Sequence, residues 1–240
     1  IQPSQSDYWQ ATRAMGHGDF QVLVFAPSTV QEMADLAYLA FEKADEYRMP
    51  AMILSDGMLG QMMEPVVMPE PRDEQVEKPW ATTGHKHARP HNVVNSLYLT
   101  ADELERLNIE RYERYAQIER DEQRAETFLV DDADVVVVAF GASARVARSA
   151  VVEARAKGVK AGLVRPITLW PFPVDALEAA VPTAKAFLTV EMNMGQMVDD
   201  VRLAINGRVP VEFFGRTGGI IPTPDEVLGA IRKLAGKGGE

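Results

Sequence analysis

The chain contains no cysteine among its 240 residues. It therefore has no disulfide, no thiol nucleophile and no cysteine-ligated iron–sulfur cluster of its own. It also lacks any apolar run close to the roughly 20 residues that span a bilayer. The basic excess that nucleic acid binding requires is absent too, since the formal net charge is −10. We therefore expect neither a membrane nor a nucleic acid as a partner.

What the chain does have is an ordinary globular composition, with 46% hydrophobic and 25% charged residues. Residues 1–5 show no basic segment followed by an apolar one, which is the pattern of a signal peptide. We interpret the chain as beginning inside a longer protein, and we expect a cytoplasmic location.

The first section predicts a strand, a helix and a second strand. Residues 20–26 and 51–54 are short apolar runs typical of buried strands. Thr29 and Glu32 have the spacing of a capping box, so a helix is expected from there to residue 47. Strand, helix and strand with short links indicate two parallel strands. The predicted apolar face of the helix consists of Val30, Met33, Ala34, Ala37, Phe41 and Ala44.

The middle section is irregular. Five prolines between residues 64 and 96 exclude regular elements, and a charged connector helix is expected over residues 101–126. His85, His87 and His91 lie in the irregular part, where exposed histidines are a simpler explanation than a metal site, and no metal site is predicted. His17 precedes the first strand, where a turn is favoured over a catalytic base. A methionine group is interpreted as a subunit interface or core patch: Met58, Met62, Met63 and Met68.

The last section alternates strands with helices, which indicates a doubly wound parallel sheet. The predicted fold is thus α/β, with two doubly wound parallel-sheet modules at residues 1–70 and 127–240, joined by a linker and connector helix at 71–126. In the second module strands are predicted at 135–140, 159–164, 186–190 and 211–214, and helices from 143 to 158, at 173–180 and 196–205, and from 223 on.

Ligands of open parallel sheets bind at the carboxyl ends of the strands. This rule selects the four loops at residues 26–28, 55–57, 140–143 and 191–193, although small polar residues there also suit plain turns and caps. Gly141 opens a predicted helix that Ser143 caps, but the spacing of glycines in a dinucleotide site is absent. No nucleotide-binding or hydrolase motif is found, so the residues alone do not specify a reaction.

Eight segments in the sequence carry a resemblance to a known family: residues 16–20, 26–33, 53–57, 139–141, 164–173, 191–197, 214–219 and 222–224. In this order, and over nearly the whole chain, they resemble 2-oxoacid:ferredoxin oxidoreductase alpha subunits. The first module is similar to the second half of their pyrimidine-binding domain, and the second module to the transketolase-type C-terminal domain that follows. Within the family the 2-oxoisovalerate branch is most similar and the 2-oxoglutarate branch next.

This resemblance implies oxidative decarboxylation of a 2-oxoacid to its acyl-CoA, with electrons passed to ferredoxin. It implies thiamine diphosphate with Mg shared with a beta subunit, a 4Fe-4S cluster on that partner only, coenzyme A, and possible gamma and delta subunits. The chain is then not active alone. The alternatives are a subunit of another thiamine enzyme, of the transketolase or 2-oxoacid dehydrogenase type, and a non-catalytic assembly fragment.

In the family the activating glutamate and the substrate-binding residues lie upstream of the segment that resembles residues 3–7, so no catalytic residue is assigned here. Gln5 and Asp7, next to that segment, are the predicted cofactor-binding residues. Asp56 and Gly57, at a strand end, are the next candidates. A partial domain would leave a sheet edge and an apolar face uncovered.

Overall fold

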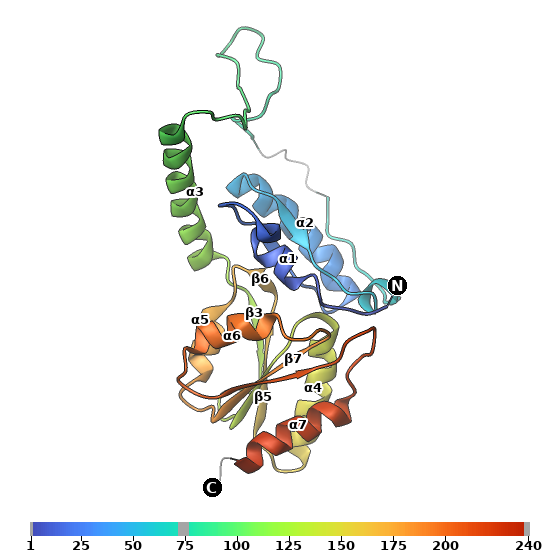
Figure 1. The fold of residues 1–240 in the computed structure, drawn as a ribbon. Coiled ribbons are helices and arrows are strands. Elements are labelled where there is room, and N and C mark those ends of the chain that lie inside the picture. The colour runs from blue at the N-terminus through green and yellow to red at the C-terminus, as the bar shows by residue number, and fades with distance from the viewer. Residues whose placement is uncertain (1, 72–76, 238–240) are drawn as a thin grey trace.

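Two β-sheets stacked end to end form the body of the computed structural model, which describes residues 2–71 and 77–237 (Figure 1). No helix in these ranges is both long and apolar enough to cross a membrane. The elements in chain order are α1 (Tyr8–Thr12), η1 (Ala14–Gly16), β1 (Leu23–Phe25), α2 (Val30–Tyr47), β2 (Ala51–Ile53), η2 (Leu59–Gln61), α3 (Ala101–Asp121), β3 (Ala125–Phe128), β4 (Val135–Val138), α4 (Gly141–Ala156), β5 (Ala161–Pro166), β6 (Thr168–Trp170), α5 (Val174–Ala180), β7 (Ala186–Glu191), α6 (Met197–Ile205), β8 (Val211–Gly215) and α7 (Pro224–Lys237).

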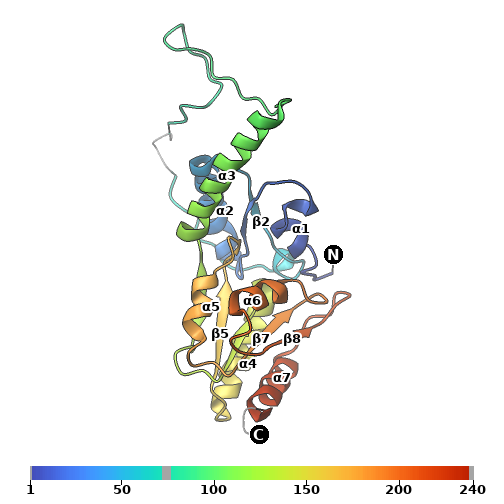
Figure 2. The same cartoon turned by 60° about the vertical axis from the view of Figure 1, so that its left-hand side comes forward.

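The larger sheet has the strand order β3-β5-β4-β7-β8 and is covered by helices on both faces (Figures 1 and 2). Its four strands from β4 to β8 are parallel, which confirms the doubly wound module predicted from the sequence. In β4, Val136 and Val138 pack toward α5 and α6, whereas Val135 and Val137 pack toward α4 and α7. A strand buried on both faces explains the unbroken run of valines.

The smaller sheet has the order β2-β1-β6, and β1 and β2 pair in parallel as predicted. Its third strand, β6, comes from the C-terminal section and pairs antiparallel with β1. The described part of the chain pairs nothing with the outer edge of β2. This strand therefore leaves one open edge of the sheet among the described residues.

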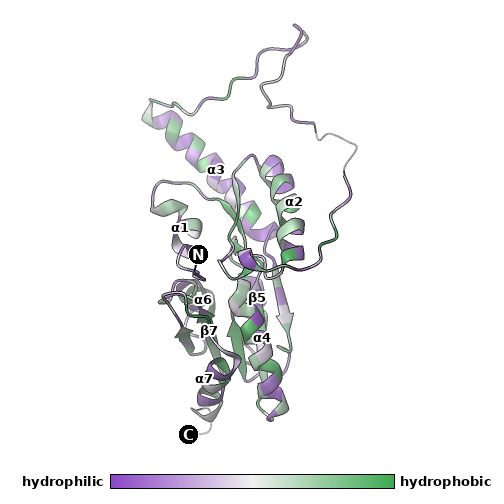
Figure 3. Ribbon diagram, turned by 90° about the vertical axis from the view of Figure 1, so that its right-hand side faces the viewer, coloured by the Kyte–Doolittle hydropathy of each residue, from purple (hydrophilic) through white to green (hydrophobic). Residues whose placement is uncertain are grey.

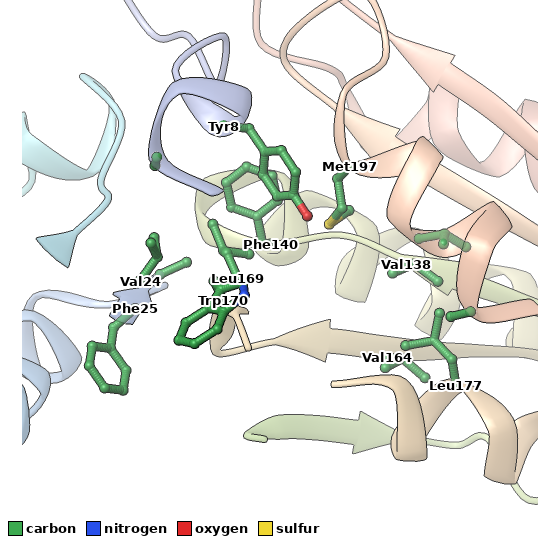
Figure 4. Packing of buried hydrophobic residues seen from close by; sticks show 14 of the residues in the cluster. Tyr8, Val24, Phe25, Val138, Phe140, Val164, Leu169, Trp170, Leu177 and Met197 are labelled. Carbon is green, nitrogen blue, oxygen red and sulfur yellow. The ribbon is translucent and has the colours of Figure 1, made fainter. Parts of the chain in front are cut away.

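One hydrophobic core runs through both sheets. Figure 4 shows Phe25 of β1 near Trp170 of β6, with Leu169, Phe140 and Tyr8 continuing toward Met197 of α6. All of these side chains belong to one buried cluster. Because a shared core transmits unfolding from one side to the other, we expect the two sheets to unfold together.

The connector helix is shorter than the sequence predicts. It ends at Asp121, and residues 125–128 form strand β3 instead of its last turn. The reason is tertiary pairing: β3 lies antiparallel to β5, and the carbonyl of Arg124 accepts the N–H groups of Ile167 and Thr168. Such pairing overrides the helix propensity of a charged segment.

Two local predictions about helices are also corrected. In α2 the fully buried residues are Leu36, Ala40 and Tyr47, so the core side lies next to the predicted apolar face. On that predicted face Phe41 is 79% exposed and the other five residues are half-buried. In α4 the helix begins at Gly141 after Phe140, and Ser143 does not cap it. The side chain of Ser143 is engaged elsewhere, as shown below. By contrast, Thr29 caps α2 as predicted, accepting the N–H of Glu32 at 3.0 Å.

Glu122 ties the end of α3 to α2. Its side chain is buried and lies 2.6 Å from Lys43 and 3.0 Å from Arg124, and it accepts the hydroxyl of Tyr47 at 2.9 Å. Burial acts to raise the pKa of Glu122, but hydrogen bonds from Lys43, Tyr47 and Arg124 outweigh it and lower the pKa below its ordinary value of 4.5. In the same cluster, burial and the Glu122 carboxylate raise the pKa of Tyr47 to about 12.

We expect Glu122→Gln to lower the free energy of unfolding by about 2 kcal/mol at pH 7, because the variant loses charged hydrogen bonds in a buried place. A lowered folded-state pKa contributes stability above the unfolded pKa, and this stability is lost as the pH falls through the folded pKa. The difference between wild type and variant should therefore shrink below about pH 4.5. Urea unfolding at pH 7, 5, 4 and 3 measures it, with the exposed Glu119→Gln as control. A difference that stays constant down to pH 3 contradicts this prediction.

Candidate functional site

The carboxyl ends of β4 and β7 form the centre of the candidate site. They are neighbouring strands whose following helices, α4 and α6, lie on opposite faces of the sheet. This is the topological switch point, where open parallel sheets leave a crevice that can bind a ligand. Two of the loops selected from the sequence, at residues 140–143 and 191–193, flank it.

Glu191 closes β7 and is fully buried. One carboxylate oxygen accepts the N–H of Val198 at 3.0 Å, the other accepts the N–H of Met197 at 2.8 Å and the amide of Asn193 at 2.9 Å, and the N–H of Gln196 lies within 3.3 Å of both. Burial raises the pKa of Glu191, and these donors act in the opposite direction. Since all four partners are donors, the ionised carboxylate is the form that the site satisfies at the start of α6.

Gln5 occupies the crevice at the switch point. Its side-chain nitrogen donates to the carbonyl of Phe140 at 2.9 Å, and its side-chain oxygen accepts the hydroxyl of Ser143 at 2.8 Å and the N–H of Met192 at 3.0 Å. Its backbone N–H donates to Met192, and its carbonyl accepts the amide of Asn193. The buried side chain of Gln5 therefore occupies the place where such sheets usually bind a ligand.

Asp56 meets Gln5 around Gly141. One carboxylate oxygen accepts the N–H of Ala142 at 3.2 Å, and the other accepts the N–H groups of Met58 and Leu59. Gly141 has φ +56°, and a Cβ there would lie 3.2 Å from the Gln5 nitrogen and 3.3 Å from an Asp56 oxygen. A glycine is required because the backbone is left-handed and crowded at this point.

Helix α1 clamps the N-terminal segment onto α6. The hydroxyl of Tyr8 donates to Asp200 at 2.6 Å, and Arg13 binds the other oxygen of this carboxylate at 2.6 Å. Trp9 adds bonds from its backbone and ring nitrogens to Gln196. Burial, followed by the charge of Asp200, raises the pKa of Tyr8 well above its ordinary value, so this phenol stays a hydrogen-bond donor.

The contacts of Gln5, Asp56 and Glu191 around Gly141 are called the junction below. A chain of ion pairs joins the two sheets beside it. Arg165 of β5 forms a double contact with Glu32 of α2, at 2.7 and 3.0 Å, and also binds Glu126 of β3 at 2.8 Å. Arg145 of α4 binds Glu64 at 3.1 Å and the carbonyl of Ser28 at 3.0 Å. The bond from Arg145 to Ser28 thereby brings the loop at residues 26–28 next to the other three loops.

The structure brings together all four loops that the strand-end rule selected. Of the predicted cofactor-binding residues, Gln5 and Asp56 are buried and meet at Gly141, and Gly57 is half-buried beside Asp56. Asp7 is exposed and makes no side-chain cap bond to α1. A cofactor role for these four residues stays a prediction. Sequence reasoning missed Asp200 altogether, because nothing local in the sequence signals its contacts with α1.

The histidines lie apart from this junction. His17 is exposed between η1 and β1, and His85, His87 and His91 lie in the irregular segment before α3. The Nε2 atoms of His85 and His91 are 3.1 Å apart. Within residues 2–71 and 77–237, no group of three or more potential metal ligands is found. In the methionine group, Met63 and Met68 are 97% and 73% exposed, so they form no core patch and the interface interpretation stays a prediction.

The junction by itself does not form a thiamine site. The side-chain oxygens of Gln5 and Asp56 already accept hydrogen bonds from the protein, and the nitrogen of Gln5 donates to Phe140. A cofactor would have to break these buried bonds, which costs about 1–3 kcal/mol for each group left without a partner. These bonds instead hold the N-terminal segment and the four strand-end loops rigidly together. We derive no catalytic step from this arrangement.

Comparisons with known proteins identify the class. Residues 1–133 match the family described as pyruvate flavodoxin/ferredoxin oxidoreductase, thiamine diP-bdg, and residues 133–227 match pyruvate:ferredoxin oxidoreductase core domain II. In fold, the chain is similar to a 2-oxoglutarate:ferredoxin oxidoreductase from Magnetococcus marinus, solved with 2-oxoglutarate, coenzyme A and succinyl-CoA bound, with a TM-score of 0.75 at 20% identity. That match covers 98% of this chain and 46% of the other.

The curated relatives are more similar in sequence. The ketoisovalerate oxidoreductase subunit VorB of Methanothermobacter thermautotrophicus is 47% identical over 237 residues, which cover 98% of this chain and 67% of that protein. The 2-oxoglutarate synthase subunit KorA of Methanothermobacter marburgensis is 34% identical over 95% of this chain and 68% of that protein. The chain thus spans about two thirds of the length of these relatives. It belongs to the 2-oxoacid:ferredoxin oxidoreductase family.

Proposed function

We propose that the chain is part of the alpha subunit of an enzyme that oxidatively decarboxylates 2-oxoisovalerate to its acyl-CoA. The observation that carries this proposal is the 47% identity with a ketoisovalerate oxidoreductase subunit over 98% of the chain. The lower identity with 2-oxoglutarate synthase subunits, 34%, makes 2-oxoglutarate the second candidate substrate. Electrons pass to ferredoxin in this proposal.

Cofactors and partners follow from the same proposal. Thiamine diphosphate supplies the carbanion-stabilising chemistry, and it binds with Mg between this subunit and a beta subunit. This sequence has no cysteine, which fits a 4Fe-4S cluster carried by the beta subunit. Coenzyme A is the acyl acceptor, gamma and delta subunits are possible further partners, and the complex is cytoplasmic.

An assay of the purified complex tests the proposal. We expect 2-oxoisovalerate to support reduction of a low-potential dye that depends on coenzyme A, with kcat/KM at least about 10-fold above that for 2-oxoglutarate and pyruvate. A pocket that fits one side chain discriminates by roughly 1–3 kcal/mol per methylene, which corresponds to such a ratio. Reduction of NAD in place of the dye, or a preference for 2-oxoglutarate, contradicts the corresponding part of the proposal.

A second candidate is a non-catalytic assembly module. It is supported by the junction around Gly141, where the polar groups of Gln5, Asp56 and Glu191 serve the packing of the chain itself. Thiamine content separates the two candidates: a purified complex that contains this chain and a cluster-bearing partner, but less than one thiamine per pair, supports the assembly role. A likeness of fold to a split gene transketolase, with a TM-score of 0.51 at 18% identity, does not favour transketolase chemistry.

A further inference from the structure

Residues 78–100 form a loop that extends away from both sheets, beyond the beginning of α3 (Figures 1 and 3). The loop contains no helix or strand, and its residues add nothing to either buried cluster of the core. Its shape therefore depends on hydrogen bonds within the loop. These bonds fall into two groups, one at the neck, where residues 79–83 meet residues 89–92, and one at the tip, residues 84–88.

The neck is closed by groups that do not titrate near neutral pH. The guanidinium of Arg89 donates to the carbonyl of Thr83 at 3.2 Å and to its hydroxyl at 3.3 Å. The side-chain amide of Asn92 donates to the carbonyl of Ala81 at 2.9 Å and to the carbonyl of Pro79. Guanidinium groups stay charged and amides stay neutral in water near pH 7. The neck therefore keeps its bonds when histidines gain or lose a proton.

The tip is a tight turn with a strained backbone. The φ angles of Lys86 and His87 are +46° and +59°, in the left-handed region, and the N–H of Ala88 donates to the carbonyl of His85 at 2.7 Å. Two successive left-handed residues form a turn that favours asparagine and glycine. A lysine followed by a histidine is a poor choice for it, and such a conformation persists only where further contacts hold it.

Three histidines supply these contacts, and we call them the latch. Nδ1 of His85 accepts the N–H of His87 at 3.1 Å, and Nε2 of His85 lies 3.1 Å from Nε2 of His91. The ring of His85 also stands nearly perpendicular to the rings of His87 and His91, with ring centres 5.4 and 4.0 Å apart. The latch thus joins the turn at the tip to the returning strand of the loop.

The two bonds of His85 assign the protons of the latch. Because Nδ1 of His85 accepts, its ring proton is on Nε2, which donates to Nε2 of His91. A second proton on His85 would occupy Nδ1 and break the bond from the N–H of His87. A second proton on His91 would place two N–H groups face to face. The latch therefore closes only when both rings are neutral.

The surroundings offer a protonated latch no opposite charge. Residues 78–100 contain three basic residues, Lys78, Lys86 and Arg89, and no acidic residue. Lys78 is bound to Asp45 at the base of the loop, 2.6 Å away, and Arg89 is occupied at the neck. An added proton in the latch would therefore meet only charges of its own sign within the loop.

The same arrangement argues against a metal ion between the rings. A metal bound to Nε2 of His85 requires the ring proton on Nδ1. That atom already faces the N–H of His87 as an acceptor. The geometry therefore suits a proton between the two Nε2 atoms better than a cation.

We propose that the latch is a proton-sensitive switch, which holds the strained turn at the tip while His85 and His91 are neutral and releases it when either takes up a proton. The closed tip binds fewer protons than the released tip, so a fall in pH favours release. Imidazole changes its charge between about pH 5 and 8, so the switch works in this range. This inference concerns the loop alone and does not depend on which 2-oxoacid the protein uses.

Hydrogen exchange in the purified complex tests the switch. Mass spectrometry measures the protection of a peptide that covers residues 84–92 at pH 7.5 and 5.5, with a chelator of transition metals present. Protection is expressed relative to a synthetic peptide of the same sequence at the same pH, which removes the intrinsic pH dependence of amide exchange. We expect about 5-fold less protection at pH 5.5, because the tip then opens locally.

Two substitutions of His85 separate the hydrogen bond from the charge. In His85→Asn the side-chain oxygen accepts the N–H two residues on, as asparagine does in turns, and it does not titrate. Protection should then be retained at both pH values. His85→Ala has no acceptor, so protection should be about 5-fold lower at both. The matched control is His17→Asn, at an exposed histidine outside the loop, which should behave like the wild type.

Several results would overturn the proposal. One is wild-type protection that is the same at pH 7.5 and 5.5. Another is a loss of protection at pH 5.5 that is as large in His85→Asn as in the wild type, since a different group then titrates. A third is a tip that is protected only when the chelator is left out, because a metal ion then holds the rings together.

Discussion

Glu191→Gln is expected to lower the free energy of unfolding by about 3 kcal/mol and the melting temperature by about 10 °C. The two carboxylate oxygens accept different donors, Val198 on one side and Met197 with Asn193 on the other. Whichever way the amide turns, its nitrogen faces donors, so buried N–H groups lose their acceptor.

Thermal unfolding followed by circular dichroism measures this effect. The control is Glu119→Gln, an exchange of the same chemistry at an exposed position on α3, which should change the melting temperature by less than about 2 °C. If Glu191→Gln melts like the control, the four donors are not held by this carboxylate, and the proposed order of the junction is wrong.

Gln5→Leu is expected to lower the free energy of unfolding by about 3 kcal/mol as well. The hydroxyl of Ser143, the N–H of Met192 and the carbonyl of Phe140 would each lose a buried partner. Loosening of the N-terminal segment should follow, since Gln5 lies between the two strand ends that hold it. We therefore also expect faster tryptic cleavage after Arg13, whose guanidinium is otherwise bound to Asp200.

The matched control is Gln10→Leu, at an exposed position of α1. Comparing it with Gln5→Leu also separates the structural role of Gln5 from the cofactor role predicted from the sequence. A structural role lowers the melting temperature in the absence of thiamine diphosphate. A pure cofactor role leaves that temperature unchanged and weakens only the binding of thiamine diphosphate, which would contradict the account of the junction given above.

Much of the fold was predictable because short local patterns of residues determine many of its helices and strands. The run of valines in β4 and the capping pair Thr29 and Glu32 place their elements without reference to distant residues. The strands β3 and β6 were not predictable. Both lie antiparallel to distant partners, and their short segments carry neither the alternation nor the length that marks a strand in isolation.

The candidate site shows the same division. The strand-end rule selected the four loops that meet around Gly141, because it depends only on the order of strands. It could not show that Gln5, far away in sequence, occupies the crevice between them. Hydropathy likewise could not show that Leu36 of α2 is buried and Phe41 exposed, since both are apolar and only the packing distinguishes them.

The pairing of β1 with β6 limits which segments can be recombined between related subunits. β6 follows α4 and β5 in sequence, yet its hydrogen bonds belong to the sheet of β1 and β2. A chimaera that joins the first hundred residues of one relative to the remainder of another would therefore take β1 and β6 from different parents. The contacts between these two strands would be mismatched even if the crossover lay in an exposed loop. Recombination between relatives should succeed only where residues 23–25 and 168–170 are inherited from the same parent.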